Sequence, residues 1–254
     1  MSTRRKLIIA GLTAAAGASG LAVAAKLAVK LADRYGLIPP DHGGLYGPGE
    51  TLTYAAHRLL GTHSLAREFP RHLISKTPFA NGHPPQDEAF LRHQAAEFTN
   101  WRLTVEGLVA RPASFSLADL KLHPSRSQIT HLACEEGWSF IAEWTGVPLS
   151  HVLNLAGVLP QAKYVVYSSI QPGWWDSLDL DEARHRQTLV TYAMNGNDLP
   201  VGHGGPLRLR VPRQLGYKSV KYLTRLTVTD SLATFGKGLG SGAPEAGYSW
   251  YAGI

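Results

Sequence analysis

The chain contains a single cysteine, Cys134, in 254 residues. One cysteine cannot form an intramolecular disulfide. Cys-x-x-Cys zinc sites and the Cys-x-x-Cys-His haem-attachment motif are also excluded, because each needs at least two cysteines. Three roles remain open for Cys134: a buried inert thiol, a nucleophile, or a metal ligand. A nucleophile needs a neighbouring base, and His131 is the only candidate close to it in the sequence.

Several common nucleotide-binding and hydrolase motifs are also missing. The chain has no G-x-G-x-x-G fingerprint, no Walker A motif and no G-x-S-x-G elbow, which argues against Rossmann enzymes, P-loop NTPases and α/β-hydrolases. Strong basicity is missing too once the N-terminus is set aside. Of the net charge of +6, residues 1–34 carry +5, and the rest of the chain holds 19 basic and 18 acidic side chains. We therefore expect no nucleic-acid partner.

Residues 1–25 have the pattern of an export signal. Arg4, Arg5 and Lys6 precede an uncharged run, Leu7 to Ala25, rich in Ala and Gly, and the paired arginines are typical of the twin-arginine route. The alternative is an N-terminal membrane anchor, since 19 uncharged residues can just span a bilayer. We expect a periplasmic or exported protein, tethered to the membrane if this segment is not cleaved. An oxidising compartment disfavours spare thiols, so the retained cysteine should have a use.

Strands and short helices follow one another without regular βαβ alternation, which predicts the α+β class. Residues 26–95, rich in Gly, Pro and His, are expected to form an extended lead-in with a short helix near 52–60. Expected strands are 101–109, 129–132, 163–170, 188–193, 207–211 and 221–229, and expected helices are 116–122, 148–156 and 180–187. The 207–211 strand alternates Leu and Val with Arg208 and Arg210, which is typical of a half-buried strand.

A second centre lies near residue 216. Arg208, the turn from Leu215 to Ser219, and Lys221 bring together glycine, a hydroxyl and positive charge. This combination suits a phosphate, which is bound by backbone N–H groups and basic side chains. A solvated basic hairpin is the alternative.

Taken together, these stretches resemble the sulfite oxidase superfamily of molybdopterin-dependent oxidoreductases. The likeness is strongest to the exported bacterial group that includes the periplasmic methionine sulfoxide reductase catalytic subunit. It is carried by WRLTVEGLV, ITHLACEEGWSFIAEWTGVPL, KYVVYSSI and LVTYAMNGNDLPVGHGGPLRLRVPRQLGYKSVKYL. The resemblance implies the sulfite oxidase catalytic fold, with mixed sheets and short helices, over residues 96–232. Residues 233–254 would form a Gly- and aromatic-rich tail packed on that domain.

The resemblance also implies a site. Cys134 would ligate molybdenum as a thiolate, and Glu136 and Trp138 match the acid and the aromatic residue of the methionine sulfoxide reductase group. The cofactor, expected as the mononucleotide form of molybdopterin, would be contacted by Asn81, Cys134, Ser169, His203, Arg208, Gly216, Tyr217, Lys218, Ser219 and Lys221.

The expected function is two-electron oxygen-atom transfer, or related chemistry, on a small-molecule substrate. Glu135 and Glu136 beside the site would repel sulfite, and Trp174-Trp175-Asp176 could form a substrate wall. Electrons would be exchanged with a membrane b-type cytochrome or a soluble c-type cytochrome, and the protein is expected to be a monomer. Two alternatives are a methionine sulfoxide reductase-like repair enzyme and a non-catalytic binding module that retains the fold.

Overall fold

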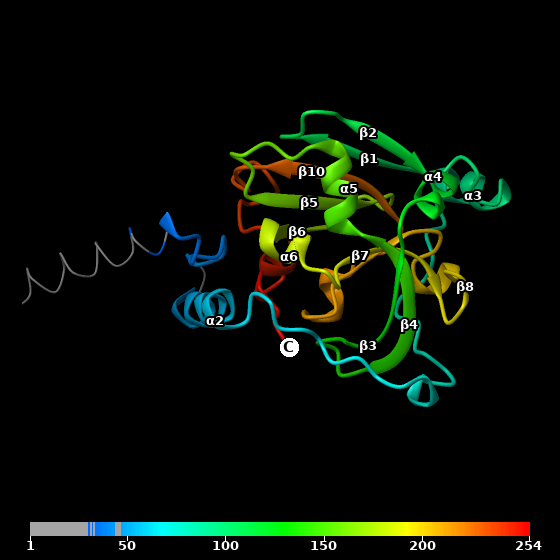
Figure 1. The fold of residues 1–254 in the computed structure, drawn as a ribbon, viewed down its shortest axis with the longest axis horizontal. Coiled ribbons are helices and arrows are strands. Elements are labelled where there is room, and N and C mark those ends of the chain that lie inside the picture. The colour runs from blue at the N-terminus through cyan, green and yellow to red at the C-terminus, as the bar shows by residue number, and fades with distance from the viewer. Residues whose placement is uncertain (1–29, 31, 33, 44–46) are drawn as a thin grey trace, which may run out of the picture.

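The protein folds around two β-sheets with short helices packed around them (Figure 1). A computed structural model describes residues 30, 32, 34–43 and 47–254. The expected export signal or anchor, residues 1–25, lies outside the described residues. The two sheets and their short helices confirm the α+β class expected from the sequence.

The first sheet has the strand order β2-β1-β10-β5-β6. Its strands are β1 (Arg102–Gly107), β2 (Ala113–Ser116), β5 (Tyr164–Ser169), β6 (Trp175–Asp179) and β10 (Leu223–Thr229). The sheet is mixed, because β1 runs parallel to β10 while the other neighbours are antiparallel. The sequence predicted β1, β5 and β10, but not β2 or β6.

The second sheet has the order β3-β4-β7-β8, with β9 paired to β7. Its strands are β3 (Arg126–Ala133), β4 (Ser139–Pro148), β7 (Leu189–Met194), β8 (Asn197–Asp198) and β9 (Arg208–Arg210). The antiparallel β3–β4 hairpin runs in unbroken register down to the pair Ala133↔Ser139. The tight turn between β7 and β8 has left-handed backbone at Asn195 (φ 52°) and Gly196 (φ 82°), as the Asn-Gly pair predicts.

The described helices are short. They are α2 (Gly47–Leu60), α3 (Glu88–Ala95), α4 (Leu117–Leu122), α5 (Leu149–Ala156), α6 (Leu180–Arg184) and α7 (Gly242–Glu245), with 3₁₀ turns η1 (Arg71–Leu73), η2 (Val201–His203) and η3 (Gly216–Lys218). Among the described residues, no helix has the length and apolarity needed to cross a bilayer. Ser116 and Asp119 form the capping box expected at the start of α4. Pro148 occupies the N-cap position of α5, whereas the sequence predicted it at the first helical position, one residue further on.

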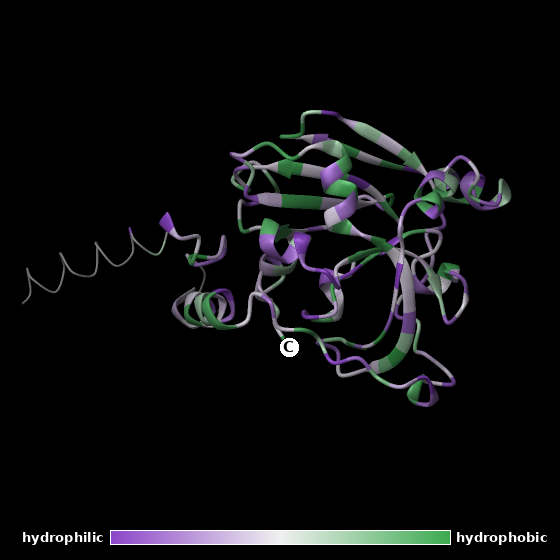
Figure 2. Ribbon diagram, in the orientation of Figure 1, coloured by the Kyte–Doolittle hydropathy of each residue, from purple (hydrophilic) through white to green (hydrophobic). Residues whose placement is uncertain are grey.

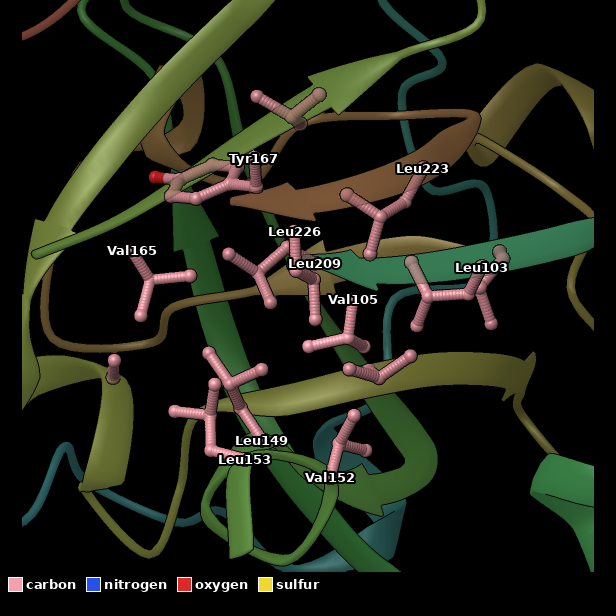
Figure 3. Packing of buried hydrophobic residues seen from close by; sticks show 14 of the residues in the cluster. Leu103, Val105, Leu149, Val152, Leu153, Val165, Tyr167, Leu209, Leu223 and Leu226 are labelled. Atoms are coloured by element: carbon pink, nitrogen blue, oxygen red, sulfur yellow. The ribbon is translucent and has the colours of Figure 1, made fainter. Parts of the chain in front are cut away.

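The main hydrophobic core lies between the first sheet and α5. Figure 2 shows hydrophobic residues along β10, β5 and α5, and Figure 3 shows Leu149, Val152 and Leu153 of α5 facing the side chains of Val105 and Leu226. All three α5 side chains are fully buried. Truncating such a side chain to Ala typically costs about 2–5 kcal/mol. The core therefore fixes α5, and with it the end of β4 that leads into the helix.

The lead-in and the tail both pack on the sheets. Phe90 of α3 is fully buried in the main core beside Trp101 and Tyr222. At the C-terminus, the ring of Trp250 is buried against Tyr54 of α2, with their centroids 5.5 Å apart. Residues 47–95 are therefore packed against the rest of the protein through Tyr54 and Phe90 and do not form a free linker.

One strand departs from its expected environment. The alternation of Leu and Arg in β9 predicted one buried and one solvated face. Both faces are buried, and Arg208 and Arg210 are only 4% and 0% exposed. This prediction was wrong because β9 lies inside the molecule, where its arginines meet backbone carbonyls from β3 and η2.

Candidate functional site

A cavity of about 250 Å³ opens where the tip of the β3–β4 hairpin meets the segment after β9. Ten of the residues singled out in the sequence line it: Asn81, Cys134, Glu136, Trp138, Ser169, Arg208, Gly216, Tyr217, Ser219 and Lys221. They come from the lead-in, the hairpin tip, the end of β5, β9 and the η3 region. The fold thus gathers into one cavity residues that are up to 140 positions apart in the chain.

Cys134 is the first residue of a tight turn that joins β3 to β4. Its backbone N–H donates to the carbonyl of Trp138 at 3.0 Å, and the N–H of Gly137 donates to the Cys134 carbonyl at 3.1 Å. Gly137 has φ 89°, a left-handed conformation that favours glycine. The register of the hairpin therefore fixes where the thiol points, as the position at a strand end predicts.

The thiol of Cys134 is held in its protonated form. Burial raises the pKa of Cys134 to about 12, and the hydrogen bond from Sγ to Glu135 at 2.9 Å adds to this effect. Within the described part of the chain, no hydrogen bond joins the thiol to His131, whose ring lies beside Phe69 instead. A protonated thiol without a base is a poor nucleophile, whereas a bound metal would displace its proton.

Glu136 ties the hairpin tip to the lead-in. Its Oε2 accepts hydrogen bonds from the indole N–H of Trp138 at 2.6 Å and from the amide of Asn81 at 2.8 Å. With Glu135 beside it, the tip presents two carboxylates at the cavity. Such a site disfavours anionic ligands at this end by like-charge repulsion.

Aromatic side chains form the walls of the cavity mouth. Trp138 stacks on Phe140 at 6.1 Å and lies 5.3 Å from Phe79, which is 52% exposed. Trp174, in the turn between β5 and β6, also lines the cavity and is 65% exposed. Of the predicted wall Trp174-Trp175-Asp176, only Trp174 lines this cavity. Trp175 instead packs on Phe235 at 6.1 Å.

The floor of the cavity is basic. Arg208 donates to the carbonyls of His203 and Ser219, both at 2.7 Å, and its Nε has no hydrogen-bond partner among the described residues. The ammonium of Lys221 donates to the carbonyls of Asn81 at 2.6 Å and Gly202 at 2.7 Å. Burial lowers the pKa of Arg208 to about 10 and that of Lys221 to about 8, where the charge of Arg208 contributes. No described carboxylate pairs with either cation.

Arg210 is a third buried cation, which lies behind the cavity near Ser219 and does not line it. It donates to the carbonyl of His131 at 2.6 Å and lies 3.5 Å from the hydroxyl of Ser219. Burial, followed by the charge of Arg208, lowers its pKa to about 9. The sequence contains a signal for the nearness of Arg210 to Arg208, because residues two apart in a strand share a face. The guanidinium groups of Arg208 and Arg210 lie 5.2 and 5.5 Å from the ring of Trp144.

Two predicted contacts, Lys218 and His203, do not line the cavity. The ammonium of Lys218 is buried and pairs with the carboxylate of Asp176, away from the cavity. The ring of His203 lies 5.5 Å from that of Phe140, and burial lowers its pKa to about 4, which keeps it neutral. Cofactor contacts by these two residues remain predictions.

The donor set fits a phosphate-bearing cofactor with a metal at Cys134. Buried cations without a carboxylate partner leave positive charge uncompensated, and a phosphate would supply the counter-charge. Gly216 lines the cavity and packs closely on the end of β3, where a Cβ would lie 3.3 Å from the carbonyl oxygen of Ala133. No group of three His, Cys, Asp or Glu side chains able to hold a metal occurs among the described residues.

Comparisons with known proteins point to one family. Residues 91–234 match the family model described as oxidoreductase molybdopterin binding domain. Over 195 residues, 77% of this chain, it is 34% identical to an Azospira oryzae protein whose assignment as protein-methionine-sulfoxide reductase subunit YedZ1 is provisional, and it covers 70% of that relative.

Two further matches are partial. The chain is 34% identical over 145 residues, 51% of its length, to the protein-methionine-sulfoxide reductase catalytic subunit MsrP of Ralstonia nicotianae, of which it spans 44%. The structure of the sulfane dehydrogenase SoxCD from Paracoccus pantotrophus superposes with a TM-score of 0.51 at 27% identity. That match covers 52% of this chain and 39% of the SoxCD chain.

Proposed function

This chain belongs to the family of oxidoreductase molybdopterin-binding domains, and we propose that it reduces neutral sulfoxides in an exported compartment. Membership makes it an oxidoreductase that carries a molybdenum–pterin cofactor, in agreement with the motifs of the sequence. One observation carries the proposal: the thiol of Cys134 and the unpaired cations Arg208 and Lys221 line one cavity whose mouth is acidic and aromatic.

The residues of the cavity would hold the cofactor at two ends. Cys134 Sγ would coordinate molybdenum, a metal that accepts soft thiolate ligands. The pterin phosphate would lie against Arg208, Lys221 and the backbone N–H groups of Gly216 to Ser219. The mononucleotide form of the cofactor is part of our proposal. When bound, the cofactor supplies the oxygen-atom-transfer chemistry, and the protein supplies binding, orientation and electrostatics.

The substrate end of the cavity favours a neutral molecule with apolar groups. Glu135 and Glu136 would repel sulfite and other anions, while Trp138 and Trp174 offer flat apolar surfaces to the groups around a sulfoxide. The names of two relatives agree with this substrate class, since one is a protein-methionine-sulfoxide reductase catalytic subunit and the other is provisionally assigned as a subunit of such a reductase. Reduction of a sulfoxide consumes two electrons and two protons and yields a thioether and water.

The proposal extends to the source of the electrons, which we place on another protein. The sequence has one cysteine and no haem-attachment motif, and we propose a membrane b-type or soluble c-type cytochrome as the donor. The paired arginines and the uncharged run at the N-terminus support export by the twin-arginine route. This route carries proteins folded around their cofactor, as a molybdenum enzyme requires.

The test begins with the cofactor. Protein purified from a host that makes molybdopterin should contain near-stoichiometric molybdenum by elemental analysis. The variant Cys134→Ser should still fold but have an altered or empty metal site. A folded wild-type protein without molybdenum would contradict the cofactor assignment and favour a binding module.

The substrate is tested on the same preparation. With a reduced viologen dye as electron donor, methionine sulfoxide should be reduced to methionine, and the Cys134→Ser variant should be inactive. Sulfite should not be oxidised when a cytochrome or ferricyanide is supplied as acceptor. Molybdenum-loaded protein that oxidises sulfite and leaves sulfoxides unchanged would refute the substrate proposal while leaving the cofactor assignment intact.

A further inference from the structure

Helix α2 packs on the protein through Tyr54 and the charged side chains on the same side of the helix. The hydroxyl of Tyr54 donates to Asp179 at 3.0 Å, and the guanidinium of Arg58 donates to the same carboxylate at 3.2 Å. One turn earlier, Glu50 accepts a hydrogen bond from the hydroxyl of Ser249 at 3.0 Å. A helix on a globular protein normally buries its apolar stripe. Here the side that meets the protein carries charged groups and Tyr54, whose ring packs on Trp250 and Tyr251, and it does not include the leucines.

The apolar side of α2 faces away from the protein. Leu52, Leu59 and Leu60 are 73%, 68% and 88% exposed. Together with the partly exposed Ala56 they occupy positions i, i+4, i+7 and i+8, which lie on one face of a helix. We call these four residues the α2 outer face. Figure 1 shows α2 projecting at one end of the molecule, and Figure 2 shows both hydrophobic and hydrophilic residues on it.

The apolar surface continues beyond the helix. Tyr35 is 66% exposed, and with Leu37 and Leu59 it lines a shallow hollow beside α2. Single exposed leucines are ordinary on protein surfaces, but a contiguous group of exposed apolar side chains marks a site of interaction. The leucines of α2 are exposed because they lie on the side of the helix opposite Tyr54, which is buried against the protein.

The chain upstream indicates what covers this surface. The uncharged run from Leu7 to Ala25 ends five residues before Lys30, and five residues span at most about 18 Å. Lys30 and Arg34 are exposed between that run and α2, and such basic side chains are attracted to anionic headgroups. A helix with an apolar outer side and basic neighbours matches a helix that lies in a membrane interface.

We propose that the α2 outer face rests in the interface of an anionic lipid bilayer. Leu52, Leu59 and Leu60 would enter the acyl boundary, while Lys30 and Arg34 contact headgroups. The proposal concerns how the protein is seated and does not depend on its catalytic chemistry. A second copy of the chain is the other occupant that such a face could accept, and the experiment separates the two.

The test is hydrogen–deuterium exchange of the full chain, read by mass spectrometry at peptides covering residues 52–60. Vesicles of phosphatidylethanolamine and phosphatidylglycerol are added, and binding is verified by co-sedimentation. We expect exchange in this segment to slow by about an order of magnitude on the vesicles. Exchange in α4 should not change, which makes that helix an internal reference.

Variants separate the outer face from the upstream run. Replacing both Leu59 and Leu60 by Glu should abolish the slowing in α2, even where the run still holds the chain on vesicles. Leu122→Glu is the matched control, because Leu122 is 85% exposed on α4, and it should leave the slowing intact. Unchanged α2 exchange in vesicle-bound wild-type protein would overturn the proposal. Protection that rises with protein concentration without lipid would also overturn it, in favour of a second copy.

Discussion

Replacing Lys218 by Met should destabilise the metal-free protein severely. The side chains of Lys218 and Asp176 are only 1% and 4% exposed, and they pair directly. The same ammonium donates to the carbonyl of Ser177 at 2.8 Å and lies 5.2 Å from the ring of Trp250. Burial raises the pKa of Asp176, and the charge of Lys218 opposes this rise. Without Lys218, a buried carboxylate would remain with no cation.

The size of the effect follows from this burial. Removing one partner of a buried ion pair costs about 3–5 kcal/mol, because the other charge is left uncompensated. This is a large share of the roughly 5–15 kcal/mol that stabilises a typical domain. In the double variant Lys218→Met with Asp176→Asn no charge remains, so its loss should be clearly smaller than the sum of the two single losses.

The assay is urea unfolding of the metal-free protein at neutral pH. The matched control is Lys121→Met, which breaks an exposed pair with Asp198 whose side chains are 43% and 83% exposed. Such a pair contributes at most about 1 kcal/mol. If Lys218→Met unfolds like wild type yet fails to retain molybdopterin, Lys218 is a cofactor ligand and our reasoning about the pair is wrong.

Three further predictions concern a buried ring, a substrate wall and a helix cap. The ring of His185 donates to the Ser64 carbonyl and accepts from the Gln187 N–H, and burial lowers its pKa to about 4 from the ordinary 6.5. Its neutral form therefore stabilises the fold fully above pH 6.5, and the free energy of unfolding should fall by up to about 1.4 kcal/mol per pH unit as the pH drops toward 4. The variant His185→Gln should show a smaller fall with pH in urea unfolding. An equal fall in both proteins would contradict the assignment. Trp174→Ala should raise KM for bulky sulfoxides about two- to tenfold, the worth of one aromatic contact, with little change in kcat; equal KM values in steady-state assays would exclude Trp174 from the wall. Ser116→Ala should cost about 1 kcal/mol in urea unfolding, and no loss would show that this cap does not stabilise α4.

The sequence predicts those parts of the fold that depend on near neighbours. The capping box of Ser116 with Asp119 involves residues three apart, and the left-handed end of α5 at Gly157 (φ 70°) depends on one glycine. The Asn195-Gly196 turn is equally local. The position of the thiol at a strand end was also predictable, because β3 has a short β-prone run before Cys134.

The sequence does not predict features that depend on distant partners. Alternating Leu and Arg describes a half-buried strand equally well, and only the carbonyl of His131, 79 positions away, reveals why Arg210 is buried. Lys218 meets a carboxylate 42 positions away. β4 also escaped prediction, because a strand buried on both faces lacks the alternation that identifies strands.

The five-residue turn at the end of β3 has a consequence for how this protein can evolve. The thiol, the two carboxylates and the indole of Trp138 all lie on that turn, while the cations of the cavity floor belong to β9 and the segment after it. In the proposed function, the substrate-facing side chains and the phosphate-binding cations therefore belong to separate pieces of backbone, and Cys134 alone on the turn holds the cofactor. Under that proposal, substitutions at Glu135, Glu136 and Trp138 would change the substrate end of the cavity while leaving Arg208 and Lys221 in place.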